Sequence, residues 1–386
     1  MRCCLKLLIL PYLGGDKMHY TELDTPVLVV DKPAMEENLK RMQAYADRHH
    51  VALRPHTKTH KTPELAKRQV ELGSKGITVA KVGEAEVMAA AGIKDIFIAN
   101  EIVGDVKYNR IQKLAETIDI SFGLDSIAQA ELIEKSFKDA AKPAQCVIEI
   151  EVGEKRSGMV EENECRKLLE YLKTCSHIHL KGVFSHDGDS YSAPDIETAR
   201  KRSVIAQRRT LKFAQMCKDA GFDITVVSIG STPSLANDSE ILEGVTEIRP
   251  GTYPFMDASQ AHATNNTWKC AAYVLATVMS RPTAERVILD VGAKGLTMQA
   301  RHDGICQTEG VGSLIDYPGT HIELMYDEHA IIYNKAFHDA VKVGDKVRIV
   351  PVHICPVVNL YDKMYLTNEK GEIIEELTIA GRGKLQ

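Results

Sequence analysis

Residues 77–99 read ITVAKVGEAEVMAAAGIKDIFIA, and this stretch contains the pattern that decides the fold. Two short runs rich in β-branched and aromatic residues, at 77–79 and 95–99, flank a helical pattern at 82–91. A strand, a helix and a second strand in this order are typical of a βαβ unit with parallel strands. The same alternation continues in both directions along the chain.

Eight candidate strands alternate with helical patterns in the first two thirds of the sequence. They are predicted at residues 27–30, 52–55, 77–79, 95–99, 118–123, 146–152, 179–185 and 225–229. Apolar residues recur at helical spacing between them, as at residues 168–172. Eight parallel strands separated by helices predict a (β/α)8 TIM barrel, and an open doubly wound sheet is the alternative.

Beyond residue 269 the pattern changes to alternating runs with few helical stretches. Turn signals at 343–345 and 368–371 separate these runs. The pattern predicts a second, mostly antiparallel β domain. We therefore expect an α/β chain with a leader at 1–21, a barrel at 22–265 and a C-terminal β domain at 266–386.

The first thirteen residues, MRCCLKLLILPYL, have some features of a signal peptide. Lys6 and Pro11 interrupt the apolar run, and no small-residue cleavage site follows it. Export is therefore disfavoured. We expect the residues before Met18 to be either a disordered leader or the product of a mis-called start.

Composition narrows the class of protein further. The 386 residues include 48 Lys and Arg against 53 Asp and Glu, a net charge of −5, so no basic surplus is present to bind nucleic acid. No apolar run reaches the roughly 20 residues of a transmembrane helix. The nine cysteines are scattered and odd in number, which indicates reduced thiols in a cytoplasmic protein.

The densest chemical cluster is RPHTKTHK at residues 54–61, at the end of the second predicted strand. In a barrel, the C-terminal ends of the strands form the active-site face. Neighbouring cations lower each other's proton affinity, and burial can turn such a lysine into an amine nucleophile. The structural alternative is a solvated basic turn.

A second candidate site is SIGSTPS at residues 228–234, after the last of the eight strands. The N–H groups of a turn such as Gly230-Ser231-Thr232 bind phosphate, and barrels commonly hold phosphate after strands seven and eight. The alternative is an ordinary capping turn, with Pro233 in the first turn of a helix.

A third candidate is His353-Ile354-Cys355, on a strand pattern of the second domain. Residues i and i+2 share one face of a strand, so His353 and Cys355 could bind one ion together. Sulfur with nitrogen suits zinc, and two protein ligands leave positions for water or substrate. The alternative is a buried thiol beside a core histidine.

Three further segments lie where a barrel has functional loops. They contain Arg156, the His186-Asp187-Gly188 turn with Tyr191, and residues 249–253. Each is also consistent with capping or turn chemistry. The dinucleotide fingerprint, the Walker loop, the G-x-S-x-G elbow and a C-x-x-C pair are missing, which disfavours nicotinamide enzymes, nucleoside triphosphatases and α/β hydrolases.

In combination these motifs resemble one family. The residues that carry the resemblance are Asp24-Thr25-Pro26, the segment at 54–61, the Gly-Ser-Thr-Pro-Ser turn, Pro250-Gly251-Thr252-Tyr253 and the late H-x-C pair. The family comprises the D-threonine aldolases and the eukaryotic-type, zinc-dependent D-serine dehydratases, which are alanine-racemase-like, fold type III enzymes of pyridoxal phosphate (PLP). The resemblance runs from about residue 24 to 381 and implies a PLP-binding barrel followed by a β domain.

The resemblance also implies a set of cofactor-binding residues. Lys58 would hold PLP as a Schiff base, and the turn after the eighth strand would bind its phosphate. Tyr191 matches the second of two tyrosines around the family's H-x-G turn, whereas Phe184 stands at the position of the first. The implied residues are Lys58, Arg156, Tyr191, Gly230, Ser231, Thr232 and Tyr253.

The metal site and the reaction follow from the same resemblance. His353 and Cys355 would bind a divalent metal, zinc before manganese or magnesium, and His186 is a further catalytic candidate. The aldolases tend to have H-x-D at the metal site and a histidine directly before the glycine of the turn, where this chain has Asp187. Both features favour a dehydratase that converts a D-serine or D-threonine type substrate to a 2-oxo acid and ammonia.

Three alternatives remain open from the sequence. They are a D-threonine aldolase, which would release glycine and an aldehyde, a fold type III racemase, and a PLP-binding regulatory protein without enzymatic activity. The resemblance implies a homodimer. We expect it to act in the cytoplasm on a small D-amino acid, without a nucleic-acid or membrane partner.

Overall fold

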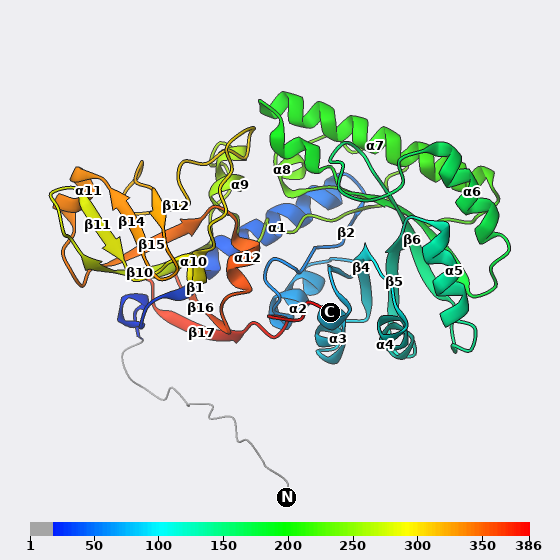
Figure 1. The fold of residues 1–386 in the computed structure, drawn as a ribbon, viewed down its shortest axis with the longest axis horizontal. Helices are drawn as coiled ribbons and strands as arrows, with labels where there is room; N and C mark the ends of the chain where they lie inside the picture. The colour runs from blue at the N-terminus through cyan, green and yellow to red at the C-terminus, as the bar shows by residue number, and fades with distance from the viewer. Residues whose placement is uncertain (1–17) are drawn as a thin grey trace, which may run out of the picture.

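A computed structural model describes residues 18–386 as two lobes, a barrel and a flatter sheet (Figure 1). Parallel strands form the eight-stranded sheet of the barrel. Their order is β2 (Ala52–Leu53), β9 (Glu247–Ile248), β8 (Val226–Ile229), β7 (Ile178–Ser185), β6 (Ala144–Ile150), β5 (Asp119–Leu124), β4 (Asp95–Glu101) and β3 (Ile77–Val79). A parallel bridge between His56 and Thr78 joins the segment after β2 to β3 and closes the sheet. The predicted (β/α)8 fold is confirmed.

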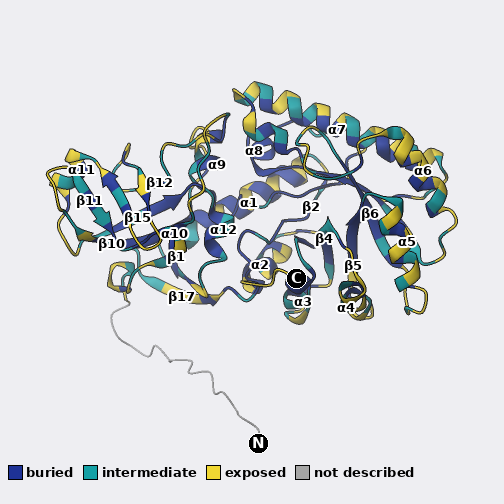
Figure 2. Cartoon of the chain, in the orientation of Figure 1, coloured by how far each residue is buried: buried dark blue, intermediate teal, exposed yellow. Residues whose placement is uncertain are grey.

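Amphipathic helices cover the outside of the barrel. They are α1 (Lys32–Arg48), α2 (Pro63–Glu71), α3 (Val82–Ala90), α4 (Asp105–Ala115), α5 (Ile127–Ser136), α6 (Glu162–Leu172) and α7 (Ile196–Asp219). In α6, for example, Cys165, Leu168 and Leu172 recur at helical spacing and are buried. Figure 2 shows the buried sides of these helices facing the strands.

The strand predicted at residues 27–30 exists, but it lies outside the barrel. β1 (Val27–Asp31) pairs with β10 (Ala272–Ser280) and β16 (Lys363–Thr367) in the other lobe. The eighth barrel strand is β9, which the sequence analysis did not predict. An alternating pattern identifies a strand without identifying its partner, and this is why the assignment of residues 27–30 to the barrel was wrong.

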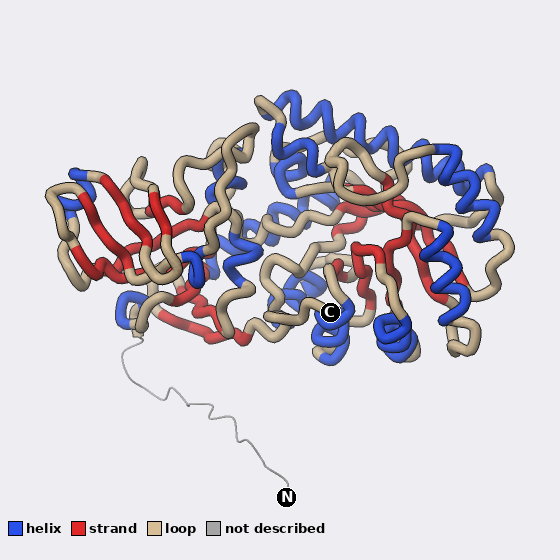
Figure 3. The backbone as a smooth tube through the Cα atoms, viewed as in Figure 1, coloured by secondary structure: helices blue, strands red, loops and turns tan. Residues whose placement is uncertain are grey.

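The second lobe is a nine-stranded sheet whose strand pairs are antiparallel except for β1 with β16. This confirms the predicted mostly antiparallel domain, and Figure 3 shows its strands gathered apart from the barrel helices. The remaining strands are β11 (Arg286–Leu289), β12 (Gly312–Leu314), β13 (Leu324–Met325), β14 (Ala330–Tyr333), β15 (Lys346–Pro351) and β17 (Ile373–Thr378). Short helices α8 (Thr232–Ala236), α9 (Ala258–Ala263), α10 (Ala293–Leu296), α11 (Lys335–Ala340) and α12 (Ile354–Val358) lie in the connections.

The last residues of the predicted leader are part of the folded structure. The Met18 carbonyl accepts a hydrogen bond from the N–H of Ile373, and the N–H of Tyr20 donates to the Gly371 carbonyl. The expectation for residues 1–17 lies outside the described part of the chain. Within residues 18–386, none of the helices combines the length and the apolar character that crossing a membrane requires.

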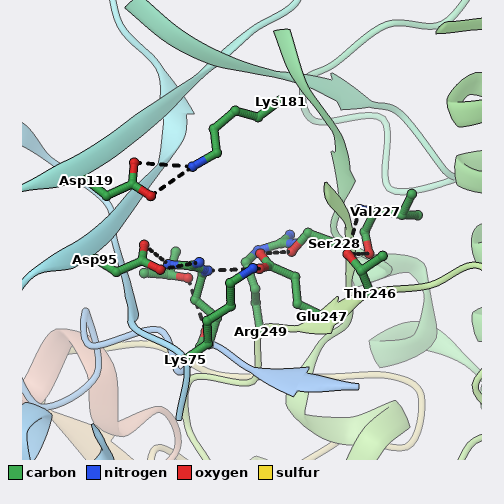
Figure 4. Close-up of polar contacts among 11 residues, drawn as sticks. Lys75, Asp95, Asp119, Lys181, Val227, Ser228, Thr246, Glu247 and Arg249 are labelled. Atoms are coloured by element: carbon green, nitrogen blue, oxygen red, sulfur yellow. Dashed lines mark hydrogen bonds and ion pairs between the residues drawn. The ribbon is translucent and has the colours of Figure 1, made fainter. Parts of the chain in front are cut away.

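Buried charges support the barrel from within (Figure 4). The Arg54 guanidinium donates to Asp95 at 2.6 Å and to Glu247 at 3.0 Å, and Arg54 and Glu247 are almost fully buried. Ser228 donates to the other carboxylate oxygen of Glu247 at 2.7 Å. Burial alone would raise the pKa of Glu247, but Arg54 and Ser228 outweigh it and lower that pKa.

We expect Arg54→Met to lower the free energy of unfolding by about 3 kcal/mol, because it removes the buried cation that donates to Glu247 and leaves only the more distant Lys75, at 3.9 Å, paired with this carboxylate. Arg48→Met is the control: its ion pair with Asp238 is exposed, and its loss should cost no more than about 1 kcal/mol. Denaturant unfolding at neutral pH measures both values.

The effect has a predictable pH dependence. Arg54 lowers the pKa of Glu247, so the contribution of the pair is present above the ordinary carboxyl pKa and is lost as the pH falls through the lowered one. The Arg54 variant should therefore approach the wild type in stability as Glu247 is protonated. Equal losses in the Arg54 and Arg48 variants at neutral pH would contradict this role.

Candidate active site

A cavity of about 220 Å³ lies where the C-terminal ends of the barrel strands meet the second lobe. Eight of the residues predicted from the sequence line it: Lys58, Arg156, His186, Tyr191, Ser231, Thr232, His353 and Cys355. The structure therefore brings together the three motifs that the sequence analysis identified separately. Gly230 and Tyr253 are not among the lining residues.

Lys58 enters the cavity from the segment that follows β2. This segment is held by hydrogen bonds from the Thr57 N–H to the Thr78 carbonyl and from the Lys61 N–H to the Thr57 carbonyl. Burial lowers the pKa of Lys58, and the nearby Arg156 guanidinium adds to that effect against the opposing Cys355 thiolate. A lysine with a lowered pKa spends more time as the neutral amine, the form that attacks a carbonyl.

The turn that the sequence predicts to bind phosphate directly follows β8. β8 ends at Ile229, Gly230 has a φ of +109°, and Pro233 lies in the first turn of α8. The positive φ favours glycine here, and a Cβ would also come within 2.8 Å of the Leu235 side chain. The Thr232 hydroxyl accepts hydrogen bonds from the N–H groups of the next loop at 3.2 and 3.0 Å, which joins the two loops.

Tyr253 was predicted beside the cofactor, but its side chain lies in the core. Its hydroxyl accepts a hydrogen bond from Gln69 at 3.0 Å, and burial raises its pKa. The preceding residues, Gly251 and Thr252, line the cavity instead. The segment at residues 250–253 therefore reaches the cavity, but the side chain of Tyr253 points into the core.

His353 and Cys355 meet at the start of a helix and not on a strand, which corrects the sequence prediction. β15 ends at Pro351, and His353 caps α12. Pro356 favours this arrangement, because proline is tolerated in the first turn of a helix but cannot donate in a sheet. Both side chains nevertheless line the cavity.

Asp257 fixes the orientation of His353. Its fully buried carboxylate accepts hydrogen bonds from His353 Nδ1 at 3.0 Å and from the Ile354 N–H at 3.1 Å. Its other oxygen accepts from the Gln260 N–H at 2.9 Å. Because Nδ1 is engaged, Nε2 of His353 remains available as a ligand.

The surroundings of Cys355 favour the thiolate form of its side chain. Burial raises its pKa, but His353, Lys58 and the Thr59 hydroxyl outweigh burial and lower the pKa to about 7. Burial likewise opposes the charge on His353, yet the thiolate and Asp257 raise its pKa to about 10. The Thr59 hydroxyl lies 3.1 Å from the sulfur, so the residue next to Lys58 contacts the thiolate directly.

The turn after β7 carries His186 and Tyr191, whose rings stack with centroids 6.0 Å apart. Glu154 holds this side of the cavity: its carboxylate accepts from His186 Nδ1 at 3.2 Å and pairs with Arg156 at 3.3 Å. A Cβ on Gly188 would come within 2.1 Å of that carboxyl group, so any larger residue would displace the Glu154 side chain.

Several lining residues were not chosen from the sequence: His56, Glu154, Gly188, Arg249, Gly251, Thr252 and Arg301. Most of them lie one or two positions from a predicted residue, so the strand-end argument could have found them. Arg301 lies in an irregular loop of the second lobe, and no sequence signal indicates it.

Two family models match the chain. Residues 30–259 match the alanine racemase N-terminal domain, and residues 271–367 match a putative serine dehydratase domain. The junction between these matches falls between the cavity loops of the barrel and the start of β10.

Curated relatives cover nearly the whole chain. A D-threonine aldolase of Arthrobacter sp is 33% identical over 383 residues, 97% of this chain and 96% of the relative. A D-threo-3-hydroxyaspartate dehydratase of Delftia sp. (strain HT23) is 32% identical over 355 residues, 86% of this chain and 91% of the relative. A D-serine dehydratase of Dictyostelium discoideum is 25% identical over 378 residues, with 91% and 95% covered.

Solved structures agree with these relatives. The D-threonine aldolase from Filomicrobium marinum superposes with a TM-score of 0.87 and 29% identity, over 96% of this chain and 99% of that one. The fold and the site thus define an alanine-racemase-like barrel enzyme of the fold type III, PLP-dependent class. Within that class, the chain belongs to the D-threonine aldolase and D-serine dehydratase family and is a lyase. The resemblance inferred from the sequence is confirmed.

The residues of the cavity fit the cofactor of this class. A lysine whose pKa is lowered stands on one side, and Ser231 and Thr232 present hydroxyls beside the first turn of α8, whose N–H groups have no acceptor within the helix. PLP requires two features of its site: an amine that reacts with its aldehyde and a turn that binds its phosphate. The imidazole and thiolate of His353 and Cys355 fit a borderline-soft divalent metal.

Proposed function

We propose that the chain is a PLP- and metal-dependent lyase of D-β-hydroxy-α-amino acids, and that it removes water from a D-serine or D-threonine type substrate. One observation carries the proposal: the Lys58 segment and the His353–Cys355 pair line one cavity, and Thr59 contacts the Cys355 sulfur at 3.1 Å. The amine site and the metal site are therefore adjacent. A substrate bound through its amine would present its β-hydroxyl beside the metal ligands.

A relative supports the assignment of His353 and Cys355 as metal ligands. Variants of a D-threo-3-hydroxyaspartate dehydratase have been solved with a histidine replaced by alanine and, two positions further, a cysteine replaced by alanine. The structure of the cysteine variant is described as the metal-free form. His353 and Cys355 have the same spacing in this chain. Sulfur and nitrogen ligands favour zinc over manganese or magnesium.

When bound, PLP supplies an electron sink at the α-carbon and a divalent metal supplies a Lewis acid for the β-hydroxyl. Lys58 holds the cofactor and, once free, is the amine placed to take the α-proton, since its lowered pKa leaves it unprotonated more often than an ordinary lysine. Ser231 and Thr232 bind the phosphate. We assign Arg156, which pairs with Glu154, to contact the phenolic oxygen of PLP.

A second reaction has specific support, because D-threonine aldolases are among the most similar relatives and structures. An aldolase needs a base that removes the proton of the β-hydroxyl so that the Cα–Cβ bond can break. His186 is the candidate, because its Nδ1 is held by Glu154 and its ring faces the cavity beside Tyr191. The H-x-C pair favours dehydration over this alternative.

Product analysis with D-threonine decides between the two, because both reactions accept it. The holoenzyme with added zinc or manganese should yield 2-oxobutyrate and ammonia. Glycine and acetaldehyde as products would instead establish an aldolase. They would also show that the cysteine of the H-x-C pair does not indicate a dehydratase. Failure of any D-β-hydroxy amino acid to react would contradict the proposed lyase of this substrate class.

We also infer that the protein acts as a homodimer in the cytoplasm. The seven cysteines among residues 18–386 are free thiols, which is consistent with a reducing compartment. The homodimer is an expectation from the family. The net charge of −5 continues to disfavour a nucleic-acid partner.

A further inference from the structure

The loop between α10 and β12 carries Arg301 into the cavity. The loop is anchored against the barrel by the Ile305 N–H, which donates to the Ala193 carbonyl at 2.7 Å, and by His262, whose Nδ1 lies 2.8 Å from the Ile305 carbonyl. The Arg301 carbonyl accepts from the Thr308 N–H at 3.0 Å. The backbone of Arg301 is therefore fixed, although the loop has no regular structure.

The Arg301 guanidinium lies over the ring of Tyr191, 5.1 Å from its centroid. A guanidinium on an aromatic face is held flat while its edges remain free to donate. Within residues 18–386 the side chain makes neither a hydrogen bond nor an ion pair, and its Nε is buried without a partner. A cation in this position has donors to offer to a bound anion.

The other two arginines of the cavity already form ion pairs or hydrogen bonds with neighbouring residues. Arg156 pairs with Glu149 at 3.5 Å and with Glu154 at 3.3 Å. Arg249 donates to the Ser185 carbonyl at 2.7 Å and also to the Ser228 hydroxyl. Arg301 is thus the one cavity arginine in the described chain whose guanidinium has neither a hydrogen-bond nor an ion-pair partner.

We propose that Arg301 binds the α-carboxylate of the amino-acid substrate. This inference rests on the proposed function, because it presumes an amino acid in the cavity. The other anionic and polar groups have separate sites: the phosphate at Ser231 and Thr232, and the β-hydroxyl at the metal ligands. The α-carboxylate is the one remaining charge that D-serine and D-threonine bring, and a guanidinium binds a carboxylate through two parallel hydrogen bonds.

Binding of D-alanine to the holoenzyme tests this assignment, followed by the absorbance change of the bound cofactor. D-Alanine has the amine and the carboxylate but no β-hydroxyl, so neither dehydration nor retro-aldol cleavage can follow. D-Alaninamide has the same amine without the negative charge. Arg301→Gln should weaken the binding of D-alanine by about tenfold or more and leave that of D-alaninamide within about twofold.

Two further variants complete the experiment. Arg301→Lys keeps the charge but loses the paired donors, so its affinity for D-alanine should fall between those of the wild type and Arg301→Gln. Arg208→Gln removes an exposed arginine on α7 and should change neither affinity. Melting temperature and cofactor content verify folding, and the lysine variant carries the test if the glutamine variant does not fold.

The outcomes separate this inference from the proposed function. If the wild type responds to D-alanine and Arg301→Gln responds equally, Arg301 does not bind the carboxylate. If kcat/KM falls for 3-hydroxy-D-aspartate but not for D-threonine, the arginine binds a distal carboxylate and the proposal is wrong. A wild type that responds to no D-amino acid would overturn the proposed function itself.

Discussion

Replacing Lys58 with alanine will remove the visible absorbance of the bound cofactor and reduce lyase activity by at least about a thousandfold. Lys58 is the one amine that lines the cavity in the described chain, and the proposed function gives it two tasks: to bind the cofactor covalently and to move the α-proton. No neighbouring side chain can take over both. An absorbance spectrum of the purified protein and a turnover assay measure the two losses independently.

Lys61, three positions further on, is the matched control. Its ammonium donates to Glu84 at 2.6 Å in a buried ion pair, so it is not available to the cofactor. Removing Lys61 alone would leave Glu84 charged in the interior, so the control is the double variant Lys61→Met/Glu84→Gln. It should keep the absorbance. Retention of the absorbance in the Lys58 variant would mean that another amine binds the cofactor.

Replacing Cys355 with alanine will strip the metal and abolish the activity while the cofactor stays bound. The thiolate is one of the two proposed protein ligands, and its loss should weaken metal binding by more than about 100-fold. The phosphate turn and Lys58 are unchanged, so the absorbance should persist. Metal analysis after dialysis, beside an absorbance spectrum, measures both properties in one sample.

Two other variants calibrate this result. Cys175→Ala removes a partly exposed thiol outside the cavity and should leave the metal content unchanged. Asp257→Asn loses the carboxylate that orients His353 and should weaken metal binding by about 10–100-fold. Metal content in Cys355→Ala equal to that of the wild type would remove Cys355 from the site.

The helices of the barrel could be predicted closely because their signal is local. The helical pattern predicted at 82–91 corresponds to α3 at residues 82–90, since a buried face recurs every three or four residues whatever its partner. β9 shows the opposite case. It has two residues, and its Glu247 is tolerated in the interior because Arg54, 193 positions away, neutralises it. Nothing near Glu247 in the sequence indicates that contact.

The site could be predicted where the chemistry is concentrated in one segment. Lys58, the turn at residues 230–232 and the H-x-C pair were chosen from the sequence, and all three segments contribute residues to one cavity. The local structure predicted for the H-x-C pair was wrong, because it did not take account of Pro351 and Pro356. Arg301 could not be chosen in this way. It lies over the ring of Tyr191, a neighbour that only the folded chain brings near, and it belongs to no motif.

The position of β1 has a consequence for how the enzyme can be divided. β1 lies between β10 and β16, so the barrel is an insertion into the β lobe rather than a domain that precedes it. A fragment that begins at β10 would lack the strand that joins the two halves of its sheet, and α12 with His353 and Cys355 follows β15, which pairs with β10. β1 therefore supports the sheet that leads to the proposed metal ligands, His353 and Cys355. Exchanging this lobe between relatives requires two junctions, one on each side of the barrel.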